Sequence, residues 1–378
     1  MLTRSRTQHL HDGAAKGFDL AADHIATGAA DGRIRLLTVD GEHVAEAAAH
    51  DDIINAVAVS PGGHLASAGR DRRVRLWLPG ERRTYTIGEH DHWVMGVAWS
   101  GDGMRVASCS EDGTVAVWEP DGAAVLSIDL GYPVNDVSWQ GDLIAAAGGD
   151  RSLYLLRPDG EVVRSIPGAT QLLWATALSP DGSRVAWTGR DRMLSIADVT
   201  GSEPIVVPAH DDQIWDVAWD GAGERIVTAS ADGTAAVWDA AGRALERVEV
   251  GPWVRGARLR DQTLLVTTEE GDLITFEDDG RPLPPPASVV VPNPPPACSH
   301  WEPQVEETSK RRCEECGSPD ELRLCVTCGH VGCCESQLAH GTKHWLETGH
   351  PNTIPTPAGD FAWKWCYADD MYVKKVEG

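Results

Sequence analysis

The stretch Ser108-Cys-Ser-Glu-Asp112-Gly-Thr-Val-Ala-Val-Trp118 decides the fold. Apolar and polar residues alternate on both sides of an Asp-Gly pair, which is the pattern of two short strands joined by a tight turn. The same hairpin recurs along the chain at steps of 38 to 41 residues. The acids at the turns of the seven copies are Asp31, Asp71, Asp112, Asp150, Asp191, Asp232 and Glu270. Residues 1–280 therefore form a repeat array of seven units.

Each repeat has room for four short strands. Several repeats open with a His-Asp pair, at His11, His50, His90 and His210, and a strand, the hairpin and a fourth strand follow. Four strands of this length cannot bury both faces of a sheet alone, so neighbouring units must stack. A closed propeller is the arrangement that leaves only short, protected edges. We predict an all-β propeller of seven blades.

These repeats resemble the WD-repeat β-propellers. The three copies that match best are His50, Ser67, Asp71 and Trp77; His90, Ser108, Asp112 and Trp118; and His210, Thr228, Asp232 and Trp238. The resemblance implies a buried hydrogen-bond chain from Trp through Ser or Thr and His to the turn Asp, and a buried carboxylate is tolerated only with such donors. Ala146, Trp187 and Val266 stand where Ser or Thr is expected, so their blades lack the full set.

The last blade needs a strand from another part of the chain. Residues 2–10 precede a His-Asp pair, as the fourth strands of other repeats do, and we predict that they close the ring. The competing strand is Ala287-Ser-Val-Val-Val-Pro292, which is rich in β-branched residues but flanked by prolines.

The top face of the propeller is the predicted binding surface. The residues three and five positions after each repeat opening, together with the residue before each turn acid, are expected to line it. In the fifth repeat this count gives Leu173 and Ala175. The predicted interaction residues are Arg70, Trp93, Arg190, Trp215, Trp253 and Arg255. Trp and Arg are enriched in protein-binding hot spots, and the alternative is that some of these aromatic residues pack between blades.

Nothing in the repeats indicates an enzyme. The His-Asp pairs recur at one repeat position, which favours a structural role. The sequence contains no Gly-x-Ser-x-Gly elbow, P-loop or dinucleotide fingerprint.

The composition limits the kinds of binding partner and the cellular compartment that the sequence is consistent with. A net charge of −24 argues against non-specific nucleic-acid binding, because such binding needs Lys and Arg to displace phosphate counterions. No apolar run reaches the roughly 20 residues of a membrane span, and the first residues lack the apolar core of a signal peptide. All the cysteines except Cys109 follow residue 297 in metal-ligand spacings, which fits a reducing compartment. We expect a cytoplasmic monomer, and the excess of Arg over Lys is typical of a high-GC bacterial genome.

A proline-rich linker, residues 281–297, separates the array from a second domain. Eight of its residues are proline. Such a segment favours an extended polyproline II conformation and acts as a semi-rigid spacer. A proline-motif ligand for another protein is the alternative role.

Residues 298–378 carry a dense set of metal ligands. They are Cys298, His300, Cys313, Cys316, Cys325, Cys328, Cys333, His340, His344, His350, Cys366 and Asp369. Twelve groups are enough for three tetrahedral zinc sites, and thiolate–imidazole sets of this spacing suit zinc. A domain of this size with few large apolar residues needs metal ions as cross-links to stabilise its fold. We expect a small α+β domain stabilised by three Zn²⁺ ions.

Residues 298–373 resemble the ubiquitin-protease-type (UBP-type) zinc finger. The matching stretches begin at Cys325-Val-Thr-Cys-Gly-His, His340-Gly-Thr-Lys-His and Trp365-Cys-Tyr. The resemblance implies three metal sites. They are Cys313, Cys316, Cys333 and His340; Cys325, Cys328, His344 and His350; and Cys298, His300, Cys366 and Asp369. The family commonly has a second Cys where Asp369 stands.

The resemblance also implies a ligand site, because fingers of this type often capture the free C-terminal Gly-Gly of ubiquitin. Trp365 and Tyr367 match two of the aromatic positions that hold the glycines. Two positions depart from the family pattern. Glu335 stands where the family has the Arg that pairs with the tail, and Arg323 stands where it has an aromatic residue. A carboxylate facing the tail carboxylate opposes binding.

Together these features predict a non-enzymatic scaffold with two recognition modules. The propeller would hold one protein partner and the finger a second. The runner-up function is a reader of ubiquitin-like or other free protein C-termini. A zinc-dependent hydrolase is a third possibility, but twelve ligands fill three tetrahedral sites and leave no open metal position.

Overall fold

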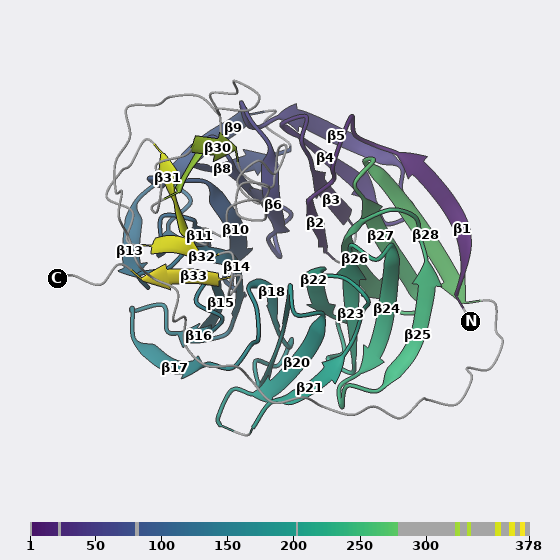
Figure 1. The fold of residues 1–378 in the computed structure, drawn as a ribbon. Helices are drawn as coiled ribbons and strands as arrows, with labels where there is room; N and C mark the ends of the chain where they lie inside the picture. The colour runs from purple at the N-terminus through teal and green to yellow at the C-terminus, as the bar shows by residue number, and fades with distance from the viewer. Residues whose placement is uncertain are drawn as a thin grey trace.

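The structure is a computed structural model that describes residues 2–21, 24–79, 83–201, 203–278, 322–325, 331–333, 352–356, 363–366 and 371–374. Its first 28 strands form seven four-stranded antiparallel sheets, which stand as blades around a central axis (Figure 1). The predicted seven-bladed all-β propeller is therefore confirmed. In the part of the chain that is described, no helix is long and apolar enough to span a bilayer.

Within blades 1 to 6 the strands are paired in chain order from the innermost outward. Blades 1 to 3 are β2 (Gly17–Leu20), β3 (His24–Gly28), β4 (Arg33–Thr38) and β5 (His43–Ala48); β6 (Ile54–Val59), β7 (Leu65–Gly69), β8 (Arg73–Leu78) and β9 (Arg83–Glu89); and β10 (Val94–Trp99), β11 (Val106–Ser110), β12 (Thr114–Trp118) and β13 (Ala124–Asp129). Blades 4 to 6 are β14 (Val134–Gln140), β15 (Leu143–Gly148), β16 (Leu153–Leu156) and β17 (Val162–Ile166); β18 (Leu173–Leu178), β19 (Arg184–Gly189), β20 (Met193–Asp198) and β21 (Ile205–Pro208); and β22 (Ile214–Trp219), β23 (Arg225–Ser230), β24 (Thr234–Asp239) and β25 (Ala244–Glu249).

Blade 7 joins the two ends of the array. It consists of β26 (Val254–Arg260), β27 (Thr263–Thr268) and β28 (Asp272–Asp278), with β1 (Leu2–His9) as its outer strand. β1 pairs antiparallel with β28 from Leu2 opposite Asp278 to His9 opposite Asp272 (Figure 1). The predicted closure by residues 2–10 is thus confirmed. The competing segment Ala287–Pro292 lies outside the described residues.

Buried hydrogen-bond chains hold the hairpins, as the repeat residues predicted. In blade 6, Trp238 Nε1 donates to Thr228 Oγ1 at 2.9 Å, and His210 Nε2 lies 2.7 Å from the same oxygen. His210 Nδ1 lies 3.0 Å from Asp232 Oδ2. Burial lowers the pKa of His210 even though Asp232 opposes this, so the ring is neutral and needs one donor and one acceptor. The hydroxyl of Thr228 therefore donates to the ring, which donates to the carboxylate.

Four other blades repeat or modify this chain. Blade 3 has it complete, with Trp118 donating to Ser108 at 2.8 Å. In blade 2 the Ser67–His50–Asp71 links are present, but within the described residues the indole nitrogen of Trp77 has no partner. Blade 1 forms the His11–Thr27 and His11–Asp31 links at 2.8 and 3.1 Å. Blade 4, where Ala146 replaces the Ser, uses the hydroxyl of Tyr154 to reach Asp150 at 2.6 Å.

Polar side chains on three of the inner strands, β2, β14 and β22, tie their blades to the next one. The bonded residues are 40 or 41 positions apart, so the link falls at closely equivalent points of successive repeats. The links are Asp19 Oδ2 to Val59 N (2.8 Å), Asp136 Oδ2 to Thr176 N (2.9 Å), Ser138 Oγ to Leu178 N (3.1 Å) and Asp216 Oδ2 to Ala257 N (3.0 Å). They satisfy inner-strand amides that have no further strand to pair with.

The C-terminal region contains one five-stranded antiparallel sheet, in the order β30-β29-β31-β32-β33. Its strands are β29 (Leu322–Cys325), β30 (Val331–Cys333), β31 (Asn352–Thr356), β32 (Trp363–Cys366) and β33 (Met371–Lys374). This sheet is consistent with the small zinc finger domain predicted for the region. Residues 340–344, which carry the predicted ligands His340 and His344, lie outside the described residues.

Candidate functional site

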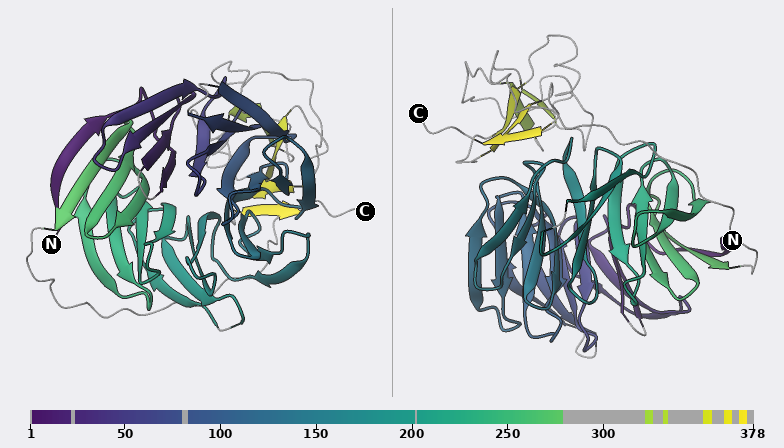
Figure 2. Two further views of the ribbon diagram at one scale, coloured as in Figure 1. Left: turned by 180° about the vertical axis from the view of Figure 1, so that it is seen from behind. Right: turned by 90° about the horizontal axis from the view of Figure 1, so that it is seen from below.

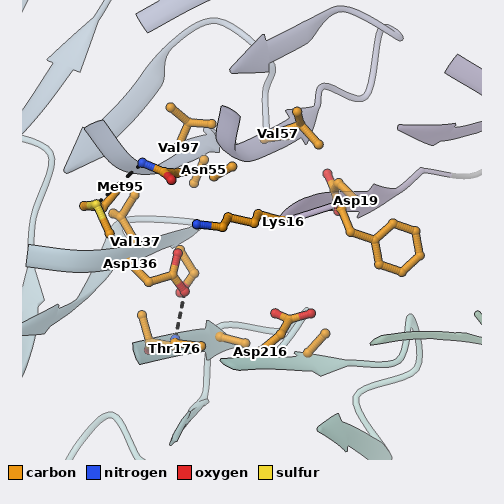
Figure 3. A pocket seen from close by; sticks show the side chains of 18 of the residues that line it. Lys16, Asp19, Asn55, Val57, Met95, Val97, Asp136, Val137, Thr176 and Asp216 are labelled. Atoms are coloured by element: carbon orange, nitrogen blue, oxygen red, sulfur yellow. Dashed lines mark hydrogen bonds between the residues drawn. The ribbon is translucent and has the colours of Figure 1, made fainter. Parts of the chain in front are cut away.

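The inner strands of all seven blades enclose one cavity of about 1100 Å³ along the propeller axis. Its wall is formed by residues at the strand ends, by the turns before the hairpin acids and by side chains of the inner strands. Figure 3 shows part of this wall, with Lys16, Asn55, Met95 and Asp136 around the open space. We call this cavity the channel, and the end lined by the turns before the hairpin acids its mouth.

A β-bulge in six of the inner strands supplies one channel residue per blade. The register shifts by one at the second residue of each strand, as between Val94 and Gly96, which leaves Met95 unpaired. A bulge re-aims a side chain out of the ladder. The six bulge residues, which all line the channel, are Asn55, Met95, Asn135, Trp174, Trp215 and Arg255. Lys16, immediately before β2, completes this ring in blade 1.

The structure corrects the sequence count in blade 5. Leu172 and Trp174 hold the positions predicted for Leu173 and Ala175. The sequence count places the opening of this repeat one residue late, because this blade has no His-Asp pair. The backbone gives the right alignment: Thr170 N donates to Asp191 at 3.3 Å, as Asp211 N donates to Asp232 at 3.0 Å.

Lys16 was also missed, although the opening His11-Asp12 offered the signal. Five residues beyond His11 is Lys16, just as five beyond His50 is Asn55 and five beyond His210 is Trp215. The same count applied to the first repeat would therefore have found it.

An arginine stacks on a tryptophan at two places in the mouth. Between blades 2 and 3, the guanidinium of Arg70 lies 4.2 Å from the ring centroid of Trp93. Beside this pair His92 contacts both the Trp93 ring, at 5.2 Å between centroids, and the buried Glu111, at 3.0 Å. Cation–π contacts of this kind fix the orientation of both groups.

The second stack joins blades 5, 6 and 7. Arg255 lies 4.5 Å from the ring of Trp215 and 5.2 Å from that of Trp253, and its Nε donates to Glu269. The ring centroids of Trp215 and Trp174 lie 5.5 Å apart, and the two ring planes are tilted by 36°. Trp174 in turn donates to Gln213 at 3.1 Å. Three tryptophans and one arginine therefore form a continuous wall on one side of the mouth, which we call the Trp wall.

Two features of the Trp wall, a strained backbone at Trp253 and a donor at Trp215 that is unpaired within the described part of the chain, cost stability. Trp253 has a φ of 49°, in the left-handed region that an aromatic residue rarely adopts. Its side chain is 43% exposed. The buried Nε1 of Trp215 has no hydrogen-bond partner among the described residues, and an orphan donor of this kind costs about 1–3 kcal/mol. Backbone strain and unpaired donors are concentrated at functional sites.

Further down the channel the wall becomes acidic. Burial raises the pKa of Asp136 to about 7, and the nearby charge of Asp216 adds to this, against the amide of Thr176 and the charge of Arg258. Asp216 forms an ion pair with Arg258, whose Nη2 also donates to the carbonyl of Phe18 at 2.6 Å. Figure 3 shows Asp19, Asp136 and Asp216 around this part of the channel.

The six propeller residues predicted from the sequence all line this one channel. They are Arg70, Trp93, Arg190, Trp215, Trp253 and Arg255. Trp93 and Trp215 also contact the neighbouring blades, through Arg70 and Trp174, so their place in the channel wall does not decide against the alternative that some of these aromatic residues pack between blades. The binding role predicted for them remains a prediction.

In the finger, the structure places five of the predicted residues by their backbone. Arg323 and Cys325 lie in β29, Cys333 ends β30, and Trp365 and Cys366 end β32. Cys325 pairs with Thr353 and Cys366 with Asn352, so one strand, β31, separates these two cysteines. The other predicted metal ligands lie outside the described residues. So do Glu335 and Tyr367, which were predicted to line the peptide-tail site. The Cys and His donors of this region fit zinc, which prefers thiolate and imidazole ligands.

Comparison with known proteins matches the two regions separately. A family model described as "WD domain, G-beta repeat" matches residues 41–77, 81–119 and 201–239. A second, described as "Zn-finger in ubiquitin-hydrolases and other protein", matches residues 313–377.

Several curated proteins resemble parts of the chain. The human Protein SEC13 homolog is 32% identical over 176 residues, which cover 36% of this chain and 55% of that protein. The Ribosome biogenesis protein WDR12 homolog of Chlamydomonas reinhardtii is 36% identical over 108 residues, covering 25% and 24%. The BRCA1-associated protein of Mus musculus is 32% identical over 81 residues, covering 21% and 13%. The matches thus span about half of the first of these proteins and less of the others. This chain carries WD repeats in a seven-bladed propeller and a UBP-type zinc finger at residues 313–377.

Proposed function

We propose that this protein is a non-enzymatic scaffold with two recognition modules, the propeller of residues 1–280 and the finger of residues 298–378, joined by the proline-rich linker. The propeller binds a protein partner at the channel mouth. The observation that carries this function is the Trp wall, where tryptophan and arginine meet in a concave site. Such residues dominate the energetics of protein interfaces.

The likeness to other WD-repeat proteins supports the same function. The WD-repeat model matches three stretches of the propeller, and parts of the chain resemble the SEC13 and WDR12 homologs. The histidines of the His-Asp pairs bond to the turn acids of the hairpins, as the 3.0 Å between His90 Nδ1 and Asp112 Oδ2 illustrates. Their recurrence in four blades supports a structural role.

The finger would act as the second module and would owe its fold to zinc. The twelve ligands named above are the proposed holders of three ions. Bound Zn²⁺ supplies cross-links between loops that have too little apolar surface to fold alone.

A reader of free protein C-termini is the second candidate function, favoured by the match to a finger found in ubiquitin hydrolases. Arg323 in β29 and Trp365 in β32 belong to one sheet, as a shared ligand site would need. Glu335 opposes this function, because it replaces a cation that would face the tail carboxylate. A charge-assisted hydrogen bond is worth about 1.5–3 kcal/mol. We therefore expect weak binding of Gly-Gly tails by the wild-type finger.

Affinity capture from the native cell tests the scaffold. The full chain is compared with a mouth variant, Trp215→Ala with Trp253→Ala, and with a finger variant, Cys325→Ser with Cys328→Ser. The expected result is loss of one set of partners in the first variant and of a different set in the second. Identical partner sets for all three proteins would contradict the proposal.

Calorimetry distinguishes the second candidate. A Leu-Arg-Gly-Gly peptide with a free or an amidated C-terminus is titrated into the wild type and Glu335→Arg. Micromolar binding of the free-carboxylate peptide to the wild type would make the finger a C-terminus reader. Binding gained only in Glu335→Arg would support a pocket tuned to another ligand.

A further inference from the structure

We infer that the channel mouth recognises an acidic peptide, with a side-chain carboxylate bound to Arg255 and a neighbouring apolar side chain packed on Trp253. This inference names the partner chemistry of the propeller and rests on the proposed platform function.

Arg255 has the properties of a carboxylate receptor. Its side chain is only 10% exposed, so its charge is largely shielded from bulk water. Nε is used by Glu269, whereas Nη1 and Nη2 have no hydrogen-bond partner within the described residues. Arg255 nevertheless lines the channel. A guanidinium presents a planar pair of donors that matches the two oxygens of a carboxylate, and such bonds are stronger than neutral ones.

The surroundings hold that guanidinium in place. The rings of Trp215 and Trp253 lie 4.5 and 5.2 Å from it, and Glu269 fixes the Nε edge. A pre-positioned arginine loses little side-chain entropy when a ligand binds. The 43% exposed indole of Trp253, next to the arginine, offers an apolar surface for the residue beside the acid.

Charge favours an anionic ligand at this end of the channel. The channel wall carries five cations and five acids, but three of the acids, Asp19, Asp136 and Asp216, lie further down than the mouth. Arg255 stands at the mouth, where Glu269 pairs with its Nε edge. A basic ligand is disfavoured for a further reason: its cation would have to displace Arg255 from the tryptophan faces and from Glu269.

A carboxylate fits better than a phosphate. Glu269 already neutralises part of the charge of Arg255, and the buried Glu111 adds a second anion to the mouth. A phosphoryl group brings a charge of about −1.5 to −2 and is bound by clusters of arginines. Because Glu269 compensates part of its charge, the guanidinium of Arg255 is better matched to a ligand group with a single negative charge.

The test uses the full chain and a synthetic library of hexapeptides, N-acetylated and C-amidated so that no free C-terminus reaches the finger. Aspartate, glutamate and phosphoserine are all included among the building blocks. Peptides retained by the wild type are identified and titrated by calorimetry into Arg255→Gln, Arg255→Lys and Trp253→Ala. Arg243→Gln is the matched control, because Arg243 also pairs with an acid, Asp239, but is 72% exposed and outside the channel.

The expected library consensus is Asp or Glu beside an apolar residue. Arg255→Gln should weaken binding roughly ten- to hundredfold, the loss of a charge-assisted hydrogen bond. Replacing the acid in the peptide by its amide should weaken binding of the wild type by a similar factor, with little further loss in Arg255→Gln. Arg255→Lys should give an intermediate affinity, Trp253→Ala should lower affinity, and Arg243→Gln should leave it unchanged. Thermal melting of each variant verifies folding.

The possible failures are distinguishable. Peptides that depend on Trp253 but carry no acid would overturn the carboxylate assignment and leave the platform standing. Preference for phosphoserine over Asp and Glu would overturn it in favour of phosphate. Absence of any peptide whose binding depends on Trp253 would overturn both this inference and the proposed use of the mouth.

Discussion

The indole Nε1 of Trp238 donates a hydrogen bond of 2.9 Å to Oγ1 of Thr228. Trp77 occupies the corresponding place in blade 2 and is equally buried, at 2% exposed against 3%, yet within the described residues its indole nitrogen has no acceptor. The two blades therefore offer a matched pair in which the same side chain is present with and without the bond.

We predict that Trp238→Phe destabilises the propeller more than Trp77→Phe does. Both changes remove a similar buried volume, but only the first breaks a hydrogen bond, which contributes about 1 kcal/mol. Trp77→Phe also removes an unsatisfied buried donor. Urea denaturation of the full-length variants measures the difference in free energy of unfolding. Equal losses would mean that the Trp238 bond contributes nothing.

Asp136 should make the propeller less stable as pH rises. Its pKa in the folded protein is about 7, above the value of about 3.9 in the unfolded chain, because burial and Asp216 disfavour the charged form. The folded state then binds more protons than the unfolded state between about pH 4 and 7, so this contribution to stability is lost as pH rises through that range.

Asp136→Asn should remove that pH dependence, because an amide oxygen still accepts the bond from Thr176 N but does not ionise. We expect the variant to be more stable than the wild type at pH 8 and to differ less from it at pH 5. Calorimetric melting at both pH values is the measurement. A variant less stable than the wild type at pH 8 would contradict the raised pKa.

Asp112 should have the opposite effect on the pH dependence of stability: it should make the propeller more stable as pH rises. Burial raises its pKa, but the hydrogen bonds from His90 and Thr114 outweigh this and bring it to about 2. A depressed pKa contributes stability above about pH 4 that is lost as pH falls towards 2, of order 2 kcal/mol. Asp112→Asn should therefore destabilise the protein at pH 7, and the gap to the wild type should narrow towards pH 2. A gap that is constant with pH would argue against the ionised carboxylate.

Deleting residues 2–9 should open blade 7. The deletion removes β1 and exposes the whole of β28, whose unpaired edge invites strand pairing between molecules. We expect a lower melting temperature and concentration-dependent aggregation, followed by light scattering after size exclusion. The matched control is deletion of residues 285–297, which removes the competing strand. Greater damage from the control deletion would contradict closure by β1.

Metal analysis of the purified full chain should give close to three zinc ions per molecule. Asp369→Ala should lower this to about two, because the third proposed site then has three ligands. A wild-type value near two, unchanged by Asp369→Ala, would show that Asp369 is not a ligand.

The fold was accessible from the sequence because its determinants are local and repeated. An Asp-Gly turn between alternating strands fixes one hairpin, and its seven recurrences fix the number of blades, whatever the contacts of any single residue. The closing strand followed from the same repetition, since residues 2–10 stand where a fourth strand is due. The metal-ligand spacing in the finger is likewise local information.

Only the tertiary structure decided which side chains meet. Arg255 and Trp215 are 40 positions apart and touch because the bulges of β22 and β26 aim both into one channel. Trp174 was missed because its blade lacks the His-Asp pair that sets the count, and a shift of one residue moves a side chain to the other face of a strand. The pKa of Asp136 depends on Asp216, two blades away around the ring. Sequence specifies the repeat, but ring closure sets the distances between repeats, and these distances determine the packing and electrostatics of the channel.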